Sequence, residues 1–206
     1  MLLIPTNPKG LTLTELLVAA ILMGIVMVGL ISVNYAIRRM ENSTSEATIL
    51  AMQTAAAMRH ITRNGLLTVG HEADPGIRYD LTTPPSVSYL SFRQDVASTP
   101  ADFTDDEWTI YTDAGEANRL YTCRQDASLG AVPDLTGPCN ALQRTMLLNN
   151  VNTFTYQLVR DPAVPSTYLE VSLQAQYDVS QPSNPLTNPV QELNVQINPP
   201  SHSWSP

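Results

Sequence analysis

The sequence contains few cysteines, histidines and lysines, and it lacks the motifs that mark common enzyme classes. Neither of its two cysteines lies in a CxxC pair, and none of its three histidines lies near a cysteine. That arrangement argues against a structural zinc site. The chain also has no G-x-S-x-G, no H-E-x-x-H and no phosphate-binding glycine-rich loop. We therefore predict that the protein is not an enzyme and holds no cofactor or metal.

Basic side chains are scarce as well. The chain has 11 lysines and arginines against 19 aspartates and glutamates, for a net charge of -8, and Lys9 is its single lysine. A protein that binds nucleic acid through a broad surface needs an excess of basic groups. No nucleic-acid partner is therefore expected. The negative charge fits a soluble surface whose copies repel one another.

The acidic residues include a dense stretch at 102–107, followed by Asp113 and Glu116. Calcium takes six to eight oxygen ligands, and the spacing of these residues matches no EF-hand. We interpret the stretch as a solvated acidic loop. The histidines are scattered along the chain, so surface or packing roles are expected for them.

The two cysteines, Cys123 and Cys139, have fifteen residues between them. If the chain is exported, a disulfide between them is the natural interpretation. Closing such a loop would contribute roughly 3 kcal/mol in the chain-entropy model. The alternative is a pair of unpaired buried thiols.

One long apolar segment stands near the N-terminus. Leu16 to Val33 is eighteen residues with Ser32 as its single polar member, which reaches the length needed to span a bilayer. No small-residue cleavage site follows it, so the segment is expected to be retained rather than removed as a secretory signal. Charge does not fix its orientation, because Lys9 precedes it and Arg38 and Arg39 follow it.

Glu15 is unexpected at the start of this segment, because a carboxylate is costly in an apolar span. One explanation is a capping box, in which Thr12 and Glu15 form the T-x-x-E pattern at a helix start. The other is a buried positive partner, and a free α-amine made by cleavage just upstream would supply one. Both explanations remain open at this stage.

The residues around Glu15 resemble the N-terminal signature of type IV pilins and pseudopilins. In that family a short polar leader ends in glycine, and an apolar residue, a T-L-x-E-L-L-like run and about twenty apolar residues follow. Here Gly10 and Leu11 precede Thr12-Leu13-Thr14-Glu15-Leu16-Leu17, and Leu11 replaces the usual phenylalanine. The resemblance implies that prepilin peptidase cuts between Gly10 and Leu11 and methylates the new Leu11 amine. It also implies that Glu15 pairs with that amine, in its own or a neighbouring subunit, during assembly.

The same resemblance implies an organisation and a set of partners. Residues 1–10 would be the leader, 11–34 the transmembrane or filament-core helix, 35–65 its amphipathic continuation, and 66–206 a β-rich domain. The chain would sit in the bacterial inner membrane with a cytoplasmic N-terminus and a periplasmic domain, and would then enter a pilus or pseudopilus. Prepilin peptidase, other pilins or pseudopilins and the inner-membrane assembly platform would be its partners. The alternative function is a membrane-anchored adhesin or binding domain.

Helical periodicity continues beyond the apolar segment. Apolar or small residues recur every three or four positions, which places them on one helical face: Ile37, Met40, Thr44, Ala47, Ala51, Thr54, Met58 and Ile61. We predict a helix from Thr14 to Asn64, with Gly65 as the residue that ends it. The rest of the chain is expected to cover the Ile37–Ile61 stripe.

Beyond Gly70 the pattern changes to short runs typical of strands, separated by turn residues. The expected strands are Ile77–Leu81, Val87–Phe92, Trp108–Thr112, Arg119–Cys123, Thr145–Leu148, Thr153–Val159, Tyr168–Tyr177 and Val190–Ile197. They indicate an α+β fold, with an antiparallel meander packed on the helix. Sixty-seven residues follow Cys139, whereas major pilins usually have a smaller domain with a disulfide near its end. The layout therefore resembles minor subunits of the W or J type.

Overall fold

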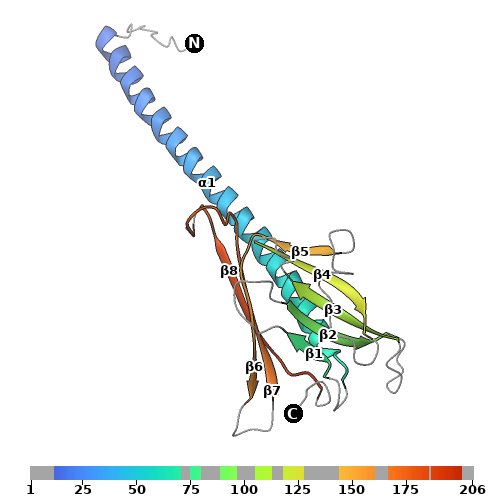
Figure 1. Ribbon diagram of the computed structural model, residues 1–206. Coiled ribbons are helices and arrows are strands. Elements are labelled where there is room, and N and C mark those ends of the chain that lie inside the picture. The colour runs from blue at the N-terminus through green and yellow to red at the C-terminus, as the bar shows by residue number, and fades with distance from the viewer. Residues whose placement is uncertain are drawn as a thin grey trace, which may run out of the picture. The chain divides into compact units, whose positions relative to one another are not determined.

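The fold is α+β, as the sequence predicts, and the described residues form one long helix and eight strands. A computed structural model describes residues 12–70, 75–79, 89–96, 105–112, 118–127, 144–160, 167–185 and 187–200. Figure 1 labels the elements: α1 (Leu13–Leu66), β1 (Ile77–Tyr79), β2 (Tyr89–Asp95), β3 (Asp106–Thr112), β4 (Arg119–Asp126), β5 (Thr145–Asn149), β6 (Val151–Arg160), β7 (Thr167–Gln176) and β8 (Val190–Ile197). Every expected strand is confirmed, with its ends shifted by a few residues at most.

Helix α1 runs without interruption through 54 residues, because no proline interrupts it and both of its early glycines are tolerated. It continues past Gly65, so the prediction that this glycine ends the helix is wrong. Gly65 is buried, and a Cβ on it would lie 2.9 Å from Ile197 Cγ2 and 3.3 Å from Phe92 Cζ. The residue is therefore glycine because two strands pack against the helix backbone at that point.

The chain divides into two compact units, Met1–Thr44 and Ser45–Pro206. The described part of the first unit is the first half of α1, which is long and apolar enough to cross a membrane. The second unit contains the last turns of α1, from Ser45, together with all eight strands. The second half of the helix is therefore part of the β-rich unit.

The strands form two antiparallel sheets rather than the single meander expected from the sequence. One sheet has the order β1-β2-β3-β4-β5 and the other the order β6-β7-β8. The chain leaves the first sheet at Asn150, whose φ of 59° lies in the left-handed region that asparagine tolerates. The Gln176 amide donates to the Asn150 carbonyl at 2.9 Å, and Asn150 Nδ2 donates to the Tyr177 carbonyl at 2.7 Å. This corner fixes where the second sheet begins.

The main core lies where α1 meets both sheets. Leu50, Ala57, Met58 and Ile61 of α1 pack with buried residues of each sheet, among them Phe92, Tyr111, Leu120, Leu169, Val171, Leu173 and Ile197. The predicted stripe is confirmed from Thr54 onward. It is wrong at Ile37 and Met40, which are 50% and 66% exposed. Coverage of the helix therefore starts about four turns later than the periodicity suggested.

The five-stranded sheet also buries its second face. Trp108 and Ile110 of β3 pack there with Cys123 of β4 and with Ala127. Alternate residues of β3 therefore point into two different cores: Tyr111 belongs to the core beneath the helix, and Ile110 belongs to the second one.

Candidate functional site

The candidate site is the start of α1, where Thr12 and Glu15 form a complete capping box. The Thr12 amide and the Thr12 hydroxyl each donate to Glu15 Oε2 at 2.9 Å. The Glu15 amide donates in return to Thr12 Oγ1 at 3.3 Å. The structure therefore confirms that Glu15 takes part in a capping box with Thr12. Gly10 and Leu11 lie outside the described residues.

The capping box uses only one of the two carboxylate oxygens. Both donors from Thr12 converge on Glu15 Oε2, and no described residue donates to Oε1. A carboxylate can accept about four hydrogen bonds, so a capping Glu15 retains room for a cation. The two explanations offered for this glutamate are thus compatible rather than exclusive.

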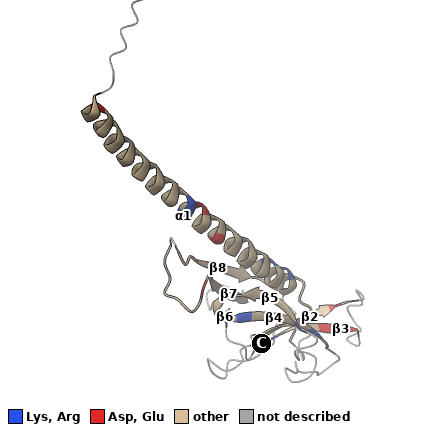
Figure 2. Ribbon diagram, turned by 90° about the horizontal axis from the view of Figure 1, so that it is seen from above, with Lys and Arg blue, Asp and Glu red and all other residues tan. Residues whose placement is uncertain are grey.

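After Glu15 the helix presents apolar side chains on every side. Each of the large apolar residues from Leu16 to Val33 is between 54% and 67% exposed. Figure 2 shows this stretch without a charged residue until the arginine pair at Arg38 and Arg39. The one polar side chain, Ser32, donates to the Val28 carbonyl at 2.9 Å and so is satisfied within the helix. A helix that is apolar all round requires a dry environment, either lipid or other helices.

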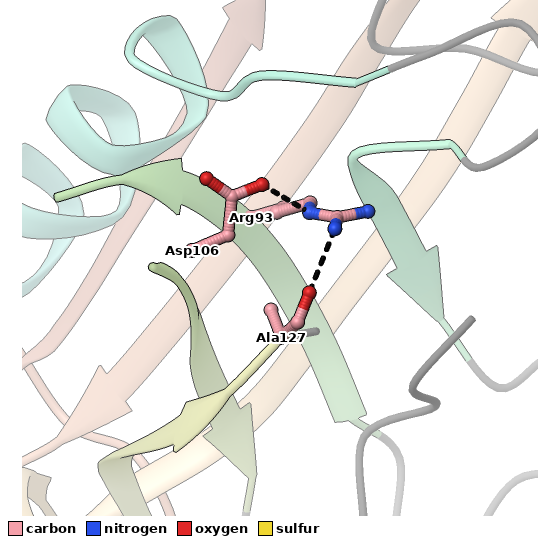
Figure 3. A network of polar contacts seen from close by, with 3 residues as sticks. All are labelled: Arg93, Asp106 and Ala127. Atoms are coloured by element: carbon pink, nitrogen blue, oxygen red, sulfur yellow. Dashed lines mark hydrogen bonds and ion pairs between the residues drawn. The ribbon is translucent and has the colours of Figure 1, made fainter. Parts of the chain in front are cut away.

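The second feature of note is a buried ion pair in the β-rich unit (Figure 3). Arg93 of β2 donates through Nε to Asp106 Oδ2 at 2.6 Å and through Nη2 to the Ala127 carbonyl at 2.7 Å. Arg93 is 0% exposed and Asp106 is 2% exposed. Burial raises the pKa of the Asp106 carboxyl, against the opposing effect of the Arg93 hydrogen bond and charge. The expectation of a solvated loop at 102–107 is therefore wrong for Asp106.

Two further carboxylates lie close to the Asp106 carboxylate of this pair. Ligand atoms of Asp95, Asp105 and Asp106 lie within 4.8 Å of one another. Asp106 already accepts from Arg93, and three monodentate carboxylates fall short of the six to eight oxygens that calcium takes. We therefore assign no metal to this cluster.

His60 belongs to a polar network that joins α1 to β3. Its Nδ1 lies 2.9 Å from the Tyr111 hydroxyl, and Asn64 Nδ2 donates to the same hydroxyl at 2.5 Å. The same hydroxyl also donates to the His60 carbonyl at 3.3 Å, so the imidazole tautomer decides whether Nδ1 accepts from the hydroxyl or donates to it. Desolvation lowers the pKa of His60, and the charges of Arg124 and Arg63 lower it further. The packing role expected for His60 fits this geometry.

The lowered pKa of His60 predicts that the β-rich unit loses stability as the pH falls. In the unfolded chain His60 takes up a proton near pH 6.5, while in the folded chain it does so only at a lower pH. The unfolded state then binds more protons, so the free energy of unfolding falls as the pH is lowered through 6.5 and levels off below the folded pKa. Urea unfolding between pH 7.5 and 5.5 measures this loss. The variant His60→Gln, which can still accept from Tyr111, should lose less over the same range; an equal loss would contradict the assignment.

Cys123 lies in β4 and is 3% exposed, next to Trp108 in the second core. Cys139 lies outside the described residues, so the Cys123–Cys139 disulfide stays a prediction. The Arg93–Asp106 pair was missed by sequence reasoning. The available signal was an arginine inside the strand run Tyr-Leu-Ser-Phe-Arg-Gln-Asp, directly after the apolar Phe92.

Comparison with known proteins adds one finding. Residues 6–31 match the family model described as the prokaryotic N-terminal methylation motif. The matched range contains Gly10, Leu11 and Glu15 as well as all of the apolar segment except its last two residues, Ser32 and Val33. No curated protein and no solved structure matches the chain.

Proposed function

Because this chain carries the N-terminal methylation motif of type IV pilin-like proteins, we propose that it is a minor pilin or pseudopilin. In this role it primes or caps the assembly of a type IV pilus or a type II secretion pseudopilus. The motif and the apolar helix fit anchoring in the inner membrane. The proposal adds the orientation: a cytoplasmic N-terminus and a periplasmic β-rich unit.

The observation that carries the proposal is the start of α1. Glu15 holds its own helix cap through Oε2 and leaves Oε1 without a donor among the described residues. Cleavage between Gly10 and Leu11 would create a charged amine one turn away. Pairing of that amine with Glu15, within the chain or between subunits, would neutralise both charges in a dry environment. The pair would set the depth at which the helix enters the filament core.

The helix suits a transfer from lipid into a filament. Its apolar side chains are exposed on every side from Leu16 to Val33, and lipid tails and packed helices are similarly dry environments. At Gly24 and Gly29, no neighbouring side chain of the described residues lies within 4 Å of the position that a Cβ atom would occupy. A close approach of neighbouring helices at these two positions would meet no side chain from this chain.

The size of the β-rich unit favours a minor over a major subunit, and within that class a W- or J-like type. Two sheets pack on the helix, and the second sheet, β6-β7-β8, follows Cys139 in the chain. A repeating shaft subunit needs only a small domain, whereas a subunit that starts or ends the filament can carry a larger one. Its partners in this proposal are prepilin peptidase, other pilins or pseudopilins and the inner-membrane assembly platform.

The experiment that tests the proposal is mass spectrometry of the mature N-terminus in cells that contain prepilin peptidase. We expect a chain that begins at N-methylated Leu11. The same sample, digested without reduction, should yield a peptide pair linked through Cys123 and Cys139.

A further inference from the structure

Strand β8 is an edge strand of the three-stranded sheet. It pairs with β7 along its whole length, from Val190 opposite Gln176 to Ile197 opposite Leu169, and its other side has no strand among the described residues. An open edge presents a row of backbone donors and acceptors that another strand can use.

The register shows which residues form that row. The Tyr177 amide donates to the Pro189 carbonyl at 3.0 Å, so positions 177 and 189 are a hydrogen-bonded pair of the antiparallel ladder. Such pairs alternate along the ladder. The residues of β8 whose backbone N–H and C=O point away from β7 are therefore Val190, Glu192, Asn194 and Gln196. Among these, one carbonyl has a described partner: Glu192 O accepts from Gln191 Nε2 at 3.3 Å.

The other edges of the two sheets are less suited to accept a strand. β1 is three residues long, and β5 is five residues long with a register shift in its pairing. β6 has a register shift between Val151 and Thr153, and the Tyr156 hydroxyl ties it to the Tyr89 carbonyl at 2.8 Å. β8 is eight residues long and regularly paired, and it contains no proline, lysine or arginine. Apart from the single charge of Glu192, it thus lacks the protective features within a strand by which edges usually avoid pairing.

The two faces of the three-stranded sheet next to β8 indicate which side chains a partner strand should carry. On the inner face, Leu193 and Val195 are only partly buried against the core. The outer face, by the ladder register, is mainly polar, with two carboxylates and no basic group: Thr153, Thr155, Gln157, Glu170, Ser172, Gln174, Glu192, Asn194 and Gln196. Val159, Tyr168 and Val190 lie on the same face at the ends of the strands. A strand added to β8 would place alternate side chains on Leu193 and Val195 and the others beside Glu192.

We propose that β8 binds a β-strand of a partner protein in which apolar and basic residues alternate. Four outward backbone units of β8 bond the added strand. Its apolar residues complete the cover of Leu193 and Val195, and its basic residues lie beside Glu192. This mode of recognition takes affinity from main-chain hydrogen bonds and specificity from the alternate side chains. The proposed binding at β8 does not depend on processing of the N-terminus. The purified full chain should therefore bind such a strand.

The test uses the full chain in a non-ionic detergent and a labelled, end-capped peptide of eight residues that alternates valine and arginine. One control peptide has the same composition in two blocks, four valines and then four arginines, and a second has glutamate in place of arginine. We expect the alternating basic peptide to bind at least about tenfold more tightly than either control. Its binding should slow hydrogen exchange at the amides of Glu192, Asn194 and Gln196. Equal binding of the block peptide, or unchanged exchange in β8, would overturn the proposal.

A matched pair of variants tests the edge itself. Asn194→Pro removes one outward N–H without removing a bond to β7, whereas Asn194→Ala keeps that N–H. We expect the proline variant to bind the alternating peptide about tenfold more weakly and the alanine variant to bind within about twofold of the wild type. Equal affinity of the two variants for the alternating peptide would show that the peptide does not bond to the outward backbone of β8. Without peptide, an apparent mass that rises with protein concentration would show that the chain associates with itself. If this association occurred through β8, the partner would be a second copy of the chain, and the proposed partner protein would be refuted.

Discussion

Replacing Glu15 with glutamine is expected to remove the chain almost completely from assembled filaments. Glutamine can still accept from Thr12 and so keeps the capping box. It cannot neutralise a charged amine at Leu11, and an unpaired charge in a dry filament core costs about 3–5 kcal/mol. We therefore expect incorporation into the sheared filament fraction to fall by at least about 100-fold, as measured by quantitative immunoblotting.

The matched control is Thr12→Ala, which removes the capping hydroxyl and leaves the Glu15 charge in place. The loss of a helix cap costs about 1 kcal/mol, so this variant should still assemble at a reduced level. If Glu15→Gln assembled like the wild type while Thr12→Ala did not, Glu15 would act as a cap alone. The pairing with a new N-terminus would then be refuted.

Replacing Asp106 with alanine should strongly destabilise the β-rich unit. The change leaves the Arg93 guanidinium buried without its carboxylate, and the Ala127 carbonyl remains as one acceptor. Breaking a buried ion pair by removing one partner costs about 3–5 kcal/mol. Urea unfolding of the full chain in detergent should show a lower midpoint, and the free energy of unfolding derived from it should be smaller by that amount.

The neighbouring residue Glu107 provides the control for this prediction. It lies 3.7 Å from Arg124, but the side chains of this pair are 38% and 72% exposed. Exposed pairs contribute about 0–1 kcal/mol, so Glu107→Ala should leave the midpoint nearly unchanged. The double variant with Arg93→Met and Asp106→Leu should recover much of the loss, because it removes both charges together. A single Asp106→Ala variant as stable as Glu107→Ala would contradict the role assigned to the buried pair.

The elements of this fold were largely predictable because their signals are local. A strict spacing of apolar residues predicted α1, and alternation predicted strands such as β7 and β8. The division into two sheets was not predictable, since it depends on the left-handed conformation of Asn150 in a sequence without a glycine or proline turn. Gly65 was misinterpreted because a glycine near a helix end favours a C-terminal cap, and only the packing of Ile197 and Phe92 shows why it is glycine.

The candidate site was predictable to a similar extent. Gly10, Leu11 and Glu15 lie within one short segment, so their pattern needs no tertiary structure to be recognised. The sequence could not show that Glu15 can cap the helix and still have an oxygen left for the counter-charge that we propose. In the structure both donors of Thr12 bond to Oε2, which leaves Oε1 for the proposed amine. Arg93 and Asp106 stand thirteen residues apart, and only the register of β2 with β3 brings their strands together, which no local pattern reveals.

The central claim is that a new, methylated N-terminus forms at Leu11, one turn before Glu15. The most direct measurement is intact and N-terminal peptide mass spectrometry of the chain from cells with and without prepilin peptidase. The account predicts a chain that begins at N-methylated Leu11 when the enzyme is present, and one that retains residues 1–10 when the enzyme is absent or when Gly10 is replaced by valine. A chain that keeps its first ten residues in the presence of the enzyme, or that begins elsewhere, would contradict it.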